Sequence, residues 1–201
     1  MKLVGMLDSP FVRRACISGR MLGLPFEHQS LSVFRDFAAF HALNPLVKAP
    51  TLVLDDGEVM VDRSLIISHL EDLAGKTLLP ADPTARRRCL QLTGLGLAAA
   101  EKSVQRYYES AVRPREARDA GWLGRVTGQL RDTYALLETR VGEADWLCGS
   151  QPTQADITVA VAWRFTRHTA PGLLPDSDFP LLAALSVRAE ALPAFVAADF
   201  S

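Results

Sequence analysis

The sequence predicts two domains of different class, an α/β domain over residues 1–76 and an all-helical domain over residues 84–201. Short apolar runs alternate with helical periodicity in the first part, and strand signals are absent from the second. Residues 77–83 contain two prolines and have the composition of a linker. A length of 201 residues allows either one large domain or two small ones.

The first strand and helix are predicted from the opening residues. The short apolar run over residues 2–7 indicates a strand. Ser9 and Pro10 then have the pattern of a helix start, with serine at the N-cap and proline in the first turn. Gly23 ends this helix and Pro25 blocks its continuation.

The rest of the first domain is predicted to add three strands and two helices. Residues 26–31 can form a second strand, and a short helix is expected over residues 35–42. Two apolar runs, 51–54 and 58–61, flank an Asp-Gly turn and indicate a hairpin. An amphipathic helix then ends at Gly75. The order β-α-β-α-β-β-α implies a mixed sheet with helices packed on it.

The second domain is predicted to be helical throughout. Apolar residues recur at steps of three and four, and Thr153 with Asp156 forms a variant of the capping box that begins a helix. The helices are expected over residues 84–112, 123–141, 157–168 and 179–191. Asp156 is assigned a structural role, and Gly94 and Gly96 are interpreted as a place where a dimer partner could approach closely.

Composition narrows the class of protein. The formal net charge of −1 argues against a dedicated nucleic-acid binder. No apolar run is long enough to cross a bilayer and no secretory signal is recognised, so we expect a cytoplasmic protein without a membrane partner. Cys16, Cys89 and Cys148 are interpreted as buried thiols that lie far apart, since three scattered cysteines make no disulfide framework.

Motifs for phosphate binding, dithiol redox chemistry and metal binding are not found in the sequence. There is no phosphate-binding glycine loop, no Cys-x-x-Cys and no histidine spacing typical of a metal site. We therefore expect no metal. An active site would depend on a cofactor or a co-substrate that carries its own reactive group.

Three stretches carry a family resemblance that extends over the whole chain. They are Ser-Pro-Phe-Val-Arg-Arg at 9–14, Asn-Pro-Leu-Val-Lys-Ala-Pro-Thr-Leu at 44–52, and Trp-Leu-Cys-Gly at 146–149 followed by Thr-Gln-Ala-Asp-Ile at 153–157. In this order they resemble the cytosolic glutathione transferase superfamily, most closely its bacterial serine-type members. The resemblance implies a thioredoxin-like N-terminal domain, a helical C-terminal domain, a homodimer and glutathione as co-substrate.

The resemblance gives Ser9 a catalytic role beside its structural one. As an N-cap before Pro10 it needs no further function. A helix N-terminus also presents free N–H groups and a partial positive charge, which favour a thiolate bound there. The resemblance implies that the Ser9 hydroxyl contacts the glutathione sulfur. Arg13, one turn further, could support the thiolate, but a surface ion pair is the preferred interpretation.

The other glutathione contacts follow the family only in part. The resemblance implies a cis bond between Ala49 and Pro50, with backbone groups open to a peptide, and Lys48 could pair with the glycine carboxylate. The family carries an acid followed by serine at the γ-glutamyl site, whereas this chain has Asp62 and then Arg63. Arg63 could bind the carboxylate itself, Ser64 could shift into the capping role, or glutathione binding could be weakened.

The electrophile is expected between the two domains, where Tyr107 or Tyr108 could stack on an aromatic substrate; a core or dimer contact is an equal alternative for both. The full set of residues expected to bind substrates is Phe11, Lys48, Ala49, Pro50, Asp62, Arg63, Ser64, Tyr107 and Tyr108.

The leading hypothesis is a glutathione S-transferase that delivers the thiolate to an electrophilic small molecule. A glutathione-dependent isomerase, dehalogenase or lyase would use the same first domain. A non-catalytic ligand-binding or adaptor protein on this fold is the alternative from another class. A disulfide reductase or peroxidase that uses Cys16 is disfavoured, because Cys16 lies in the interior of the first helix.

Overall fold

The computed structural model describes residues 1–142 and 144–200, and it divides into two compact units. The N-terminal unit contains Met1–Leu78 together with Leu192–Ser201, and the helical unit contains Leu79–Ala191. The division between Leu78 and Leu79 falls inside the stretch 77–83 that the sequence analysis gives as a linker. The expected extent of the helical domain to residue 201 does not agree with this division, because the last residues fold with the N-terminal unit.

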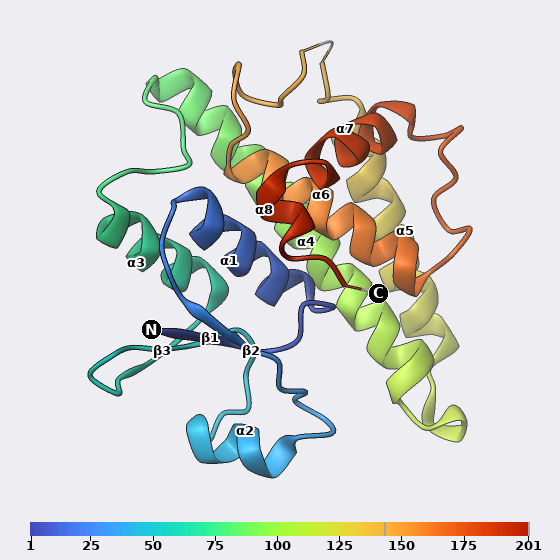
Figure 1. Cartoon of the computed structure of the whole chain (residues 1–201). Helices are drawn as coiled ribbons and strands as arrows, with labels where there is room; N and C mark the ends of the chain where they lie inside the picture. The colour runs from blue at the N-terminus through green and yellow to red at the C-terminus, as the bar shows by residue number, and fades with distance from the viewer. Residues whose placement is uncertain (143, 201) are drawn as a thin grey trace. The chain divides into compact units, whose positions relative to one another are not determined.

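The N-terminal unit has the predicted order of strands and helices, followed by one helix that returns from the far end of the chain. The elements are β1 (Lys2–Val4), α1 (Pro10–Met21), β2 (Glu27–Gln29), α2 (Phe37–Leu43), β3 (Thr51–Val53), β4 (Val59–Val61), α3 (Arg63–Ala74) and α8 (Pro193–Val196). The sheet order is β2-β1-β3-β4, with β1 parallel to β2 and the other pairs antiparallel. Helices α1 and α3 lie on one face of the sheet and α2 on the other (Figure 1). This is the thioredoxin-like fold that the resemblance implied.

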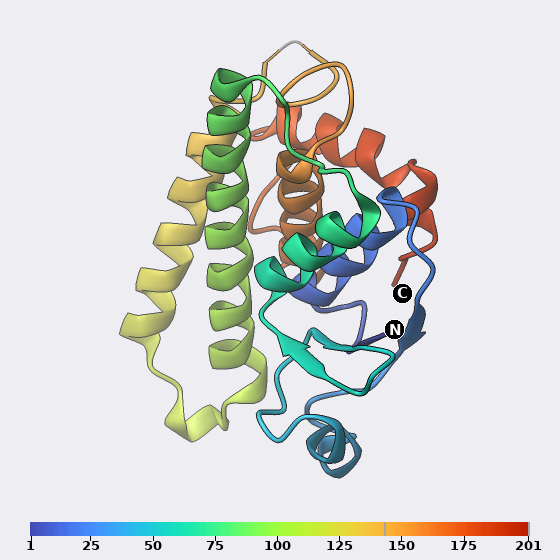
Figure 2. The same ribbon diagram turned by 90° about the vertical axis from the view of Figure 1, so that its left-hand side faces the viewer.

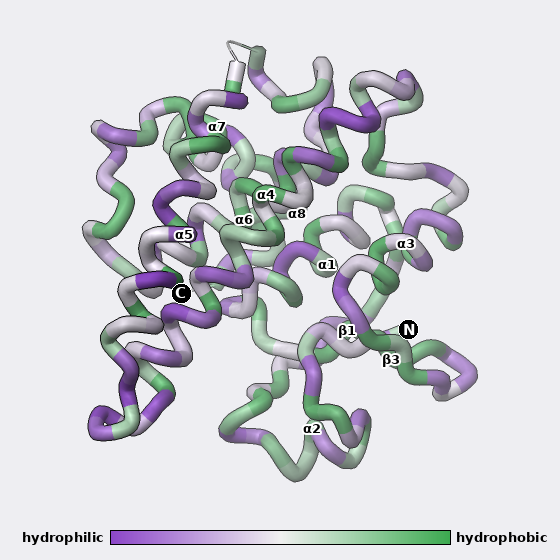
Figure 3. The backbone as a smooth tube through the Cα atoms, turned by 180° about the vertical axis from the view of Figure 1, so that it is seen from behind, coloured by the Kyte–Doolittle hydropathy of each residue, from purple (hydrophilic) through white to green (hydrophobic). Residues whose placement is uncertain are grey.

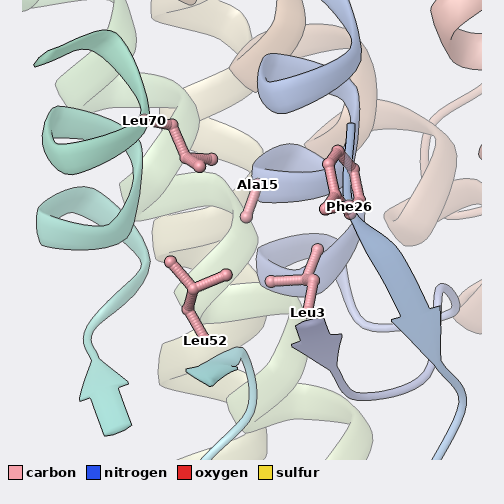
Figure 4. Close-up of a pocket in the computed structure, with 5 residues that line it drawn as sticks. All are labelled: Leu3, Ala15, Phe26, Leu52 and Leu70. Atoms are coloured by element: carbon pink, nitrogen blue, oxygen red, sulfur yellow. The ribbon is translucent and has the colours of Figure 1, made fainter. Parts of the chain in front are cut away.

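The core of the N-terminal unit lies between the sheet and its helices. A small pocket there is lined by side chains from β1, α1, the segment before β2, β3 and α3: Leu3, Ala15, Phe26, Leu52 and Leu70 (Figure 4). All five are apolar, so the pocket belongs to the hydrophobic core rather than to a ligand site. Along the β3–β4 hairpin the backbone changes from a hydrophobic strand to a hydrophilic turn, as Figure 3 shows.

The helical unit consists of α4 (Pro83–Tyr107), α5 (Ala120–Glu138), α6 (Gln154–Thr169) and α7 (Pro180–Glu190). A π-helical turn over Tyr108–Val112 continues α4, and a short 3-10 turn follows at Arg115–Ala117. Helix α4 packs against both α5 and α6, and α6 also packs against α7 (Figure 2). None of the helices within the described residues is both long and apolar enough to cross a membrane.

Gly96 allows α4 and α6 to approach closely. A Cβ at Gly96 would lie 3.0 Å from Thr158 Cγ2 and 3.2 Å from both the Thr158 carbonyl carbon and Val159 Cγ2. The interpretation of Gly96 as a dimer contact is therefore corrected, since its missing side chain serves packing inside the unit. A Cβ at Gly94 would meet nothing within 4 Å.

Asp156 fixes the start of α6, as predicted. One carboxylate oxygen accepts hydrogen bonds from the Thr153 backbone N–H and the Thr153 hydroxyl, both at 2.8 Å, and the other accepts from the Leu147 N–H at 2.8 Å. The capping box with Thr153 is complete. Burial raises the pKa of Asp156, although these hydrogen bonds act in the opposite direction. The side chain is 1% exposed, which supports its structural role.

Candidate functional site

Ser9 occupies the N-cap of α1 without using its side chain as a cap. Its backbone is extended, with φ −69° and ψ 123°, and its carbonyl accepts the Arg13 N–H at 2.9 Å. The hydroxyl makes no capping hydrogen bond. The structural interpretation of Ser9 thus holds for the backbone only. A half-buried hydroxyl is left beside the N–H groups of the first helical turn, which have no acceptor within the helix.

Gly5, which the sequence reasoning missed, brings three segments of the site together. It follows β1 with φ +137°, a conformation that favours glycine. A Cβ there would lie 2.6 Å from Val12 Cγ2 on α1 and 3.1 Å from the Ala49 Cβ. The absence of a side chain therefore sets the distance between α1 and the loop before β3. A glycine inside the first apolar run, residues 2–7, was the available signal.

The loop before β3 presents Ala49 and Pro50 in a fixed conformation. The Ala49–Pro50 bond is cis, which confirms the expectation from the resemblance. The buried Asn44 side chain donates to Thr51 Oγ1 at 2.9 Å, and the Thr51 hydroxyl donates to the Lys48 carbonyl at 2.7 Å. These bonds close the loop on itself, so that its backbone at Ala49 is held in one geometry.

Asp62 caps α3, and its carboxylate lies next to Lys48 of this loop. Its Oδ1 accepts the Ser64 N–H at 2.9 Å, and its Oδ2 lies 3.7 Å from Lys48 Nζ. The bond from Ser64 lowers the pKa of Asp62 most, burial opposes it, and the charges of Arg63 and Lys48 lower it further. Because Asp62 is the cap, Ser64 does not take over that role. The Ser64 hydroxyl instead accepts from Arg14 Nη1 at 3.5 Å.

Arg63 begins α3 and stacks on Phe11 of α1. The guanidinium carbon lies 4.1 Å from the centre of the Phe11 ring. A stacked guanidinium still directs its N–H groups outward in its own plane, where a carboxylate can bind. The charges of Lys48 and Arg63 lie close to Asp62, and the Arg14 guanidinium reaches the neighbouring Ser64, so the start of α3 carries an excess of positive charge that suits an anionic ligand. Arg14 is a second residue that the sequence reasoning missed, although it lies in the first motif.

Arg13 does not form the surface ion pair that was expected. Its side chain is fully buried, and Nε donates to the Ala198 carbonyl at 2.9 Å. The guanidinium carbon lies 5.5 Å from the Phe195 ring and 5.3 Å from the Phe200 ring. The expectation failed because these partners come from a segment 185 residues away.

Tyr107 and Tyr108 lie in the helical unit, at the end of α4. Tyr107 packs edge-on to Phe165, with ring centroids 6.5 Å apart, and Tyr108 is 44% exposed. Arg113 pairs with Glu109 at 2.8 Å. A contact of either tyrosine with an electrophilic substrate remains a prediction.

The cysteines are buried or half-buried, and two of them are neighbours. Burial raises the pKa of Cys16, which receives a hydrogen bond from Arg20 Nε at 3.4 Å. Burial also raises the pKa of Cys148 to about 12, and the facing Cys89 thiol and the Asp156 charge add to this effect. Cys89 and Cys148 are therefore distant only in sequence. Within residues 1–142 and 144–200, no three His, Cys, Asp or Glu side chains form a group that could hold a metal.

Comparison with known proteins assigns both units to one family. Residues 3–78 match the glutathione S-transferase N-terminal domain, and residues 120–186 match the glutathione S-transferase C-terminal domain. The chain belongs to the glutathione S-transferase family.

Solved structures agree over nearly the whole length. A glutathione transferase family member from Pseudomonas fluorescens Pf-5, with bound glutathione, is 30% identical with a TM-score of 0.86, covering 100% of this chain and 98% of that one. A glutathione S-transferase from Methylobacterium radiotolerans, in complex with glutathione sulfonate, is 28% identical with a TM-score of 0.90 and covers 98% and 93%.

Of two further relatives, one carries the name of an enzyme and the other is uncharacterized. Maleylacetoacetate isomerase from Pseudomonas aeruginosa is 27% identical over 171 residues, which cover 78% of this chain and 77% of the relative. The uncharacterized GST-like protein YibF from Escherichia coli is 28% identical over 179 residues, or 88% of each chain. The family is thus defined, whereas the reaction within it is not.

Proposed function

We propose that this protein is a glutathione S-transferase that binds glutathione on the N-terminal unit and activates its thiol at Ser9. The observation that carries the proposal is the Ser9 hydroxyl, which stands at the N-terminus of α1 without a capping bond. The relatives from P. fluorescens and M. radiotolerans with bound glutathione and glutathione sulfonate support it.

The chemistry at Ser9 would be the stabilisation of a thiolate. The hydroxyl donates one hydrogen bond to the glutathione sulfur, and the positive end of α1 lowers the thiol pKa. The thiol proton passes to solvent. The sulfur lone pair then forms a bond to an electrophilic carbon, and in a substitution the leaving group departs with its electron pair. Binding both reactants together supplies a further part of the rate.

The loop before β3 and the start of α3 would hold the two ends of glutathione. The Ala49 backbone, next to Pro50, pairs with the cysteinyl backbone of the tripeptide, and Lys48 attracts the glycine carboxylate. Asp62 accepts from the γ-glutamyl ammonium group, which its lowered pKa favours.

Arg63 would bind the γ-glutamyl carboxylate where the family uses serine. Its stack on Phe11 holds the guanidinium, and Ser64 with Arg14 lies beside it. A hydrogen bond to a charged group contributes about 1.5–3 kcal/mol, so the exchange to arginine need not weaken binding.

Calorimetric titration with reduced glutathione tests this assignment. Arg63→Ser should weaken binding about 10–100-fold, which corresponds to the loss of a charged hydrogen bond. Arg20→Ser is the matched control, because Arg20 also stacks on a phenylalanine, Phe26, at 5.7 Å but faces no proposed ligand. Binding that is absent in the native protein and gained in Arg63→Ser would contradict the proposal and favour a non-catalytic protein.

A glutathione-dependent isomerase is the second candidate, because the relative from P. aeruginosa is a maleylacetoacetate isomerase. On this chain such a reaction would begin with addition of the thiolate to a carbon–carbon double bond of the substrate. After rotation about the resulting single bond the sulfur would leave with its electron pair, and the double bond would form again. Turnover of an aromatic chloride and of maleylacetoacetate should be measured side by side with Ser9→Ala. Both activities need the thiolate, so Ser9→Ala should reduce whichever is present, and the better substrate decides between the candidates.

An electrophile contact by Tyr107 or Tyr108 and a homodimer complete the proposal. Either tyrosine would stack on an aromatic electrophile, so Tyr108→Ala should raise KM for the electrophile but not for glutathione. Sedimentation equilibrium tests the dimer.

A further inference from the structure

The C-terminal segment over residues 193–200, called the strap below, packs against the first helix of the N-terminal unit. It comprises α8 and the four residues that follow, and α8 contacts α1. Phe195 and Ala198 are buried, with exposures of 1% and 0%. The strap is therefore part of the N-terminal unit's core.

Arg13 is the point at which the strap holds α1. The fully buried guanidinium lies beside the rings of Phe195 and Phe200, and its Nε donates to the Ala198 carbonyl. A buried cation is stable only while such partners surround it. Loss of the strap would force the Arg13 side chain toward water, and the helical turn that carries it would have to move.

The same residue is bonded to Ser9 through the backbone. The Arg13 N–H donates to the Ser9 carbonyl at 2.9 Å, which is the bond that closes the first turn of α1. Val12, in the same turn, packs directly against Gly5, where a Cβ would lie only 2.6 Å from Val12 Cγ2. The first turn is thus fixed from two directions, and Ser9 follows any displacement of it.

We propose that the strap positions Ser9 through Arg13, so that the C-terminal residues set how well the site ionises glutathione. This inference rests on the proposed function, in which the Ser9 hydroxyl contacts the sulfur. Arg13 is a positioning residue in this scheme, because it acts through the Ser9 backbone and touches neither substrate. The proposal requires that a change in the strap alters thiol ionisation more than it alters glutathione affinity.

Two variants weaken the contact between Arg13 and the strap while keeping the cation at position 13 and an apolar side chain at position 200. Arg13→Lys retains the cation but loses the planar group that stacks on Phe195 and Phe200. Phe200→Leu retains an apolar side chain but removes one aromatic face. Arg20→Lys is the matched control, because Arg20 lies on the same helix, stacks on Phe26 and donates to Cys16 Sγ, and neither of these partners belongs to the strap.

The first measurement is the pKa of bound glutathione, read from thiolate absorbance against pH, together with kcat and the dissociation constant for glutathione. Both strap variants should raise that pKa, so that the thiolate fraction and kcat at pH 6.5 fall about 3–10-fold. The dissociation constant should change less than about two-fold, since Lys48, Asp62 and Arg63 are untouched. Equal changes in Arg20→Lys, or an unaltered thiol pKa in both strap variants, would overturn the proposal.

The second measurement does not need glutathione. Hydrogen exchange at the amide of position 13 reports directly on the bond to the Ser9 carbonyl. It should become about ten-fold faster in Phe200→Leu and stay unchanged in Arg20→Lys. If the native protein fails to bind glutathione, the proposed function is wrong and this measurement still decides whether the strap holds the turn. Unchanged exchange refutes the strap in either case.

Discussion

Replacing each of the two glycines of α4 by alanine should have opposite effects on stability, although they are only two residues apart. Gly94 is exposed and a Cβ there meets nothing within 4 Å. Glycine inside a helix costs about 1 kcal/mol relative to alanine, so Gly94→Ala should raise the free energy of unfolding by about that amount. The variant also serves as the control for its neighbour.

Gly96→Ala gains the same helix propensity but has to place its Cβ against α6. The contacts of 3.0 Å to Thr158 Cγ2 and 3.2 Å to the Thr158 carbonyl carbon are tighter than ordinary packing, and the second involves backbone that yields little. Overpacking of this kind costs about 1–3 kcal/mol. We expect Gly96→Ala to fall below Gly94→Ala by this amount and to be less stable than the native protein by up to about 2 kcal/mol.

Urea denaturation followed by circular dichroism measures the difference. With a slope of about 3 kcal/mol per molar urea, the midpoints of the two variants should differ by about 0.3–1 M. If Gly96→Ala is as stable as Gly94→Ala, the close approach of α4 and α6 at this glycine is refuted. The packing role that is assigned to Gly96 in place of a dimer contact would then be refuted as well.

Three further predictions concern ionisable groups. Asp156→Ala should lower the free energy of unfolding, measured by urea titration, by about 3–5 kcal/mol, because it leaves three donors at the start of α6 without an acceptor. The control Asp132→Ala, at an exposed position, should change this free energy little. With the pKa of Cys148 raised to about 12 from an ordinary 9.0, a thiol reagent at pH 8 should modify the folded protein about 1,000-fold more slowly than the unfolded one; a matching rate would contradict the buried environment. The lowered pKa of Asp62 keeps its carboxylate ionised, so the affinity for glutathione, measured by calorimetry, should stay constant from pH 8 down to about pH 5 and fall only in stronger acid. A decline between pH 7 and pH 5 would show that a group other than Asp62 binds the γ-glutamyl ammonium group.

Local signals in the sequence were sufficient for most elements of the fold. The proline after Ser9, the turn between the two apolar runs at 51–61 and the terminal Gly75 each specify a boundary by short-range chemistry. The order of elements along the chain indicated a mixed sheet, whereas the strand order within that sheet came from the structure. Helix α8 was missed because four residues are too few for a helical period to be recognised.

The site could be predicted where the motifs are local, and it could not where partners are distant along the chain. Asp62, Arg63 and Ser64 are adjacent in sequence, so their proximity needed no tertiary information, although the capping role of Asp62 was not predicted. The stack of Arg63 on Phe11 joins residues from two helices, and the burial of Arg13 depends on residues near 198. Long-range packing decides such environments, and the identity of a residue alone does not reveal it.

The return of residues 192–200 makes the N-terminal unit discontinuous along the chain. During synthesis on the ribosome this unit cannot be completed until the whole helical unit has been translated, so the unit that begins first finishes last. A fragment that stops at residue 78 would lack the groups that surround Arg13. The Arg13 cation would then lie without these partners next to apolar surface that the strap covers in the whole protein. For this protein, expression of the first 78 residues alone should yield an insoluble or partly folded product, although the family match ends there.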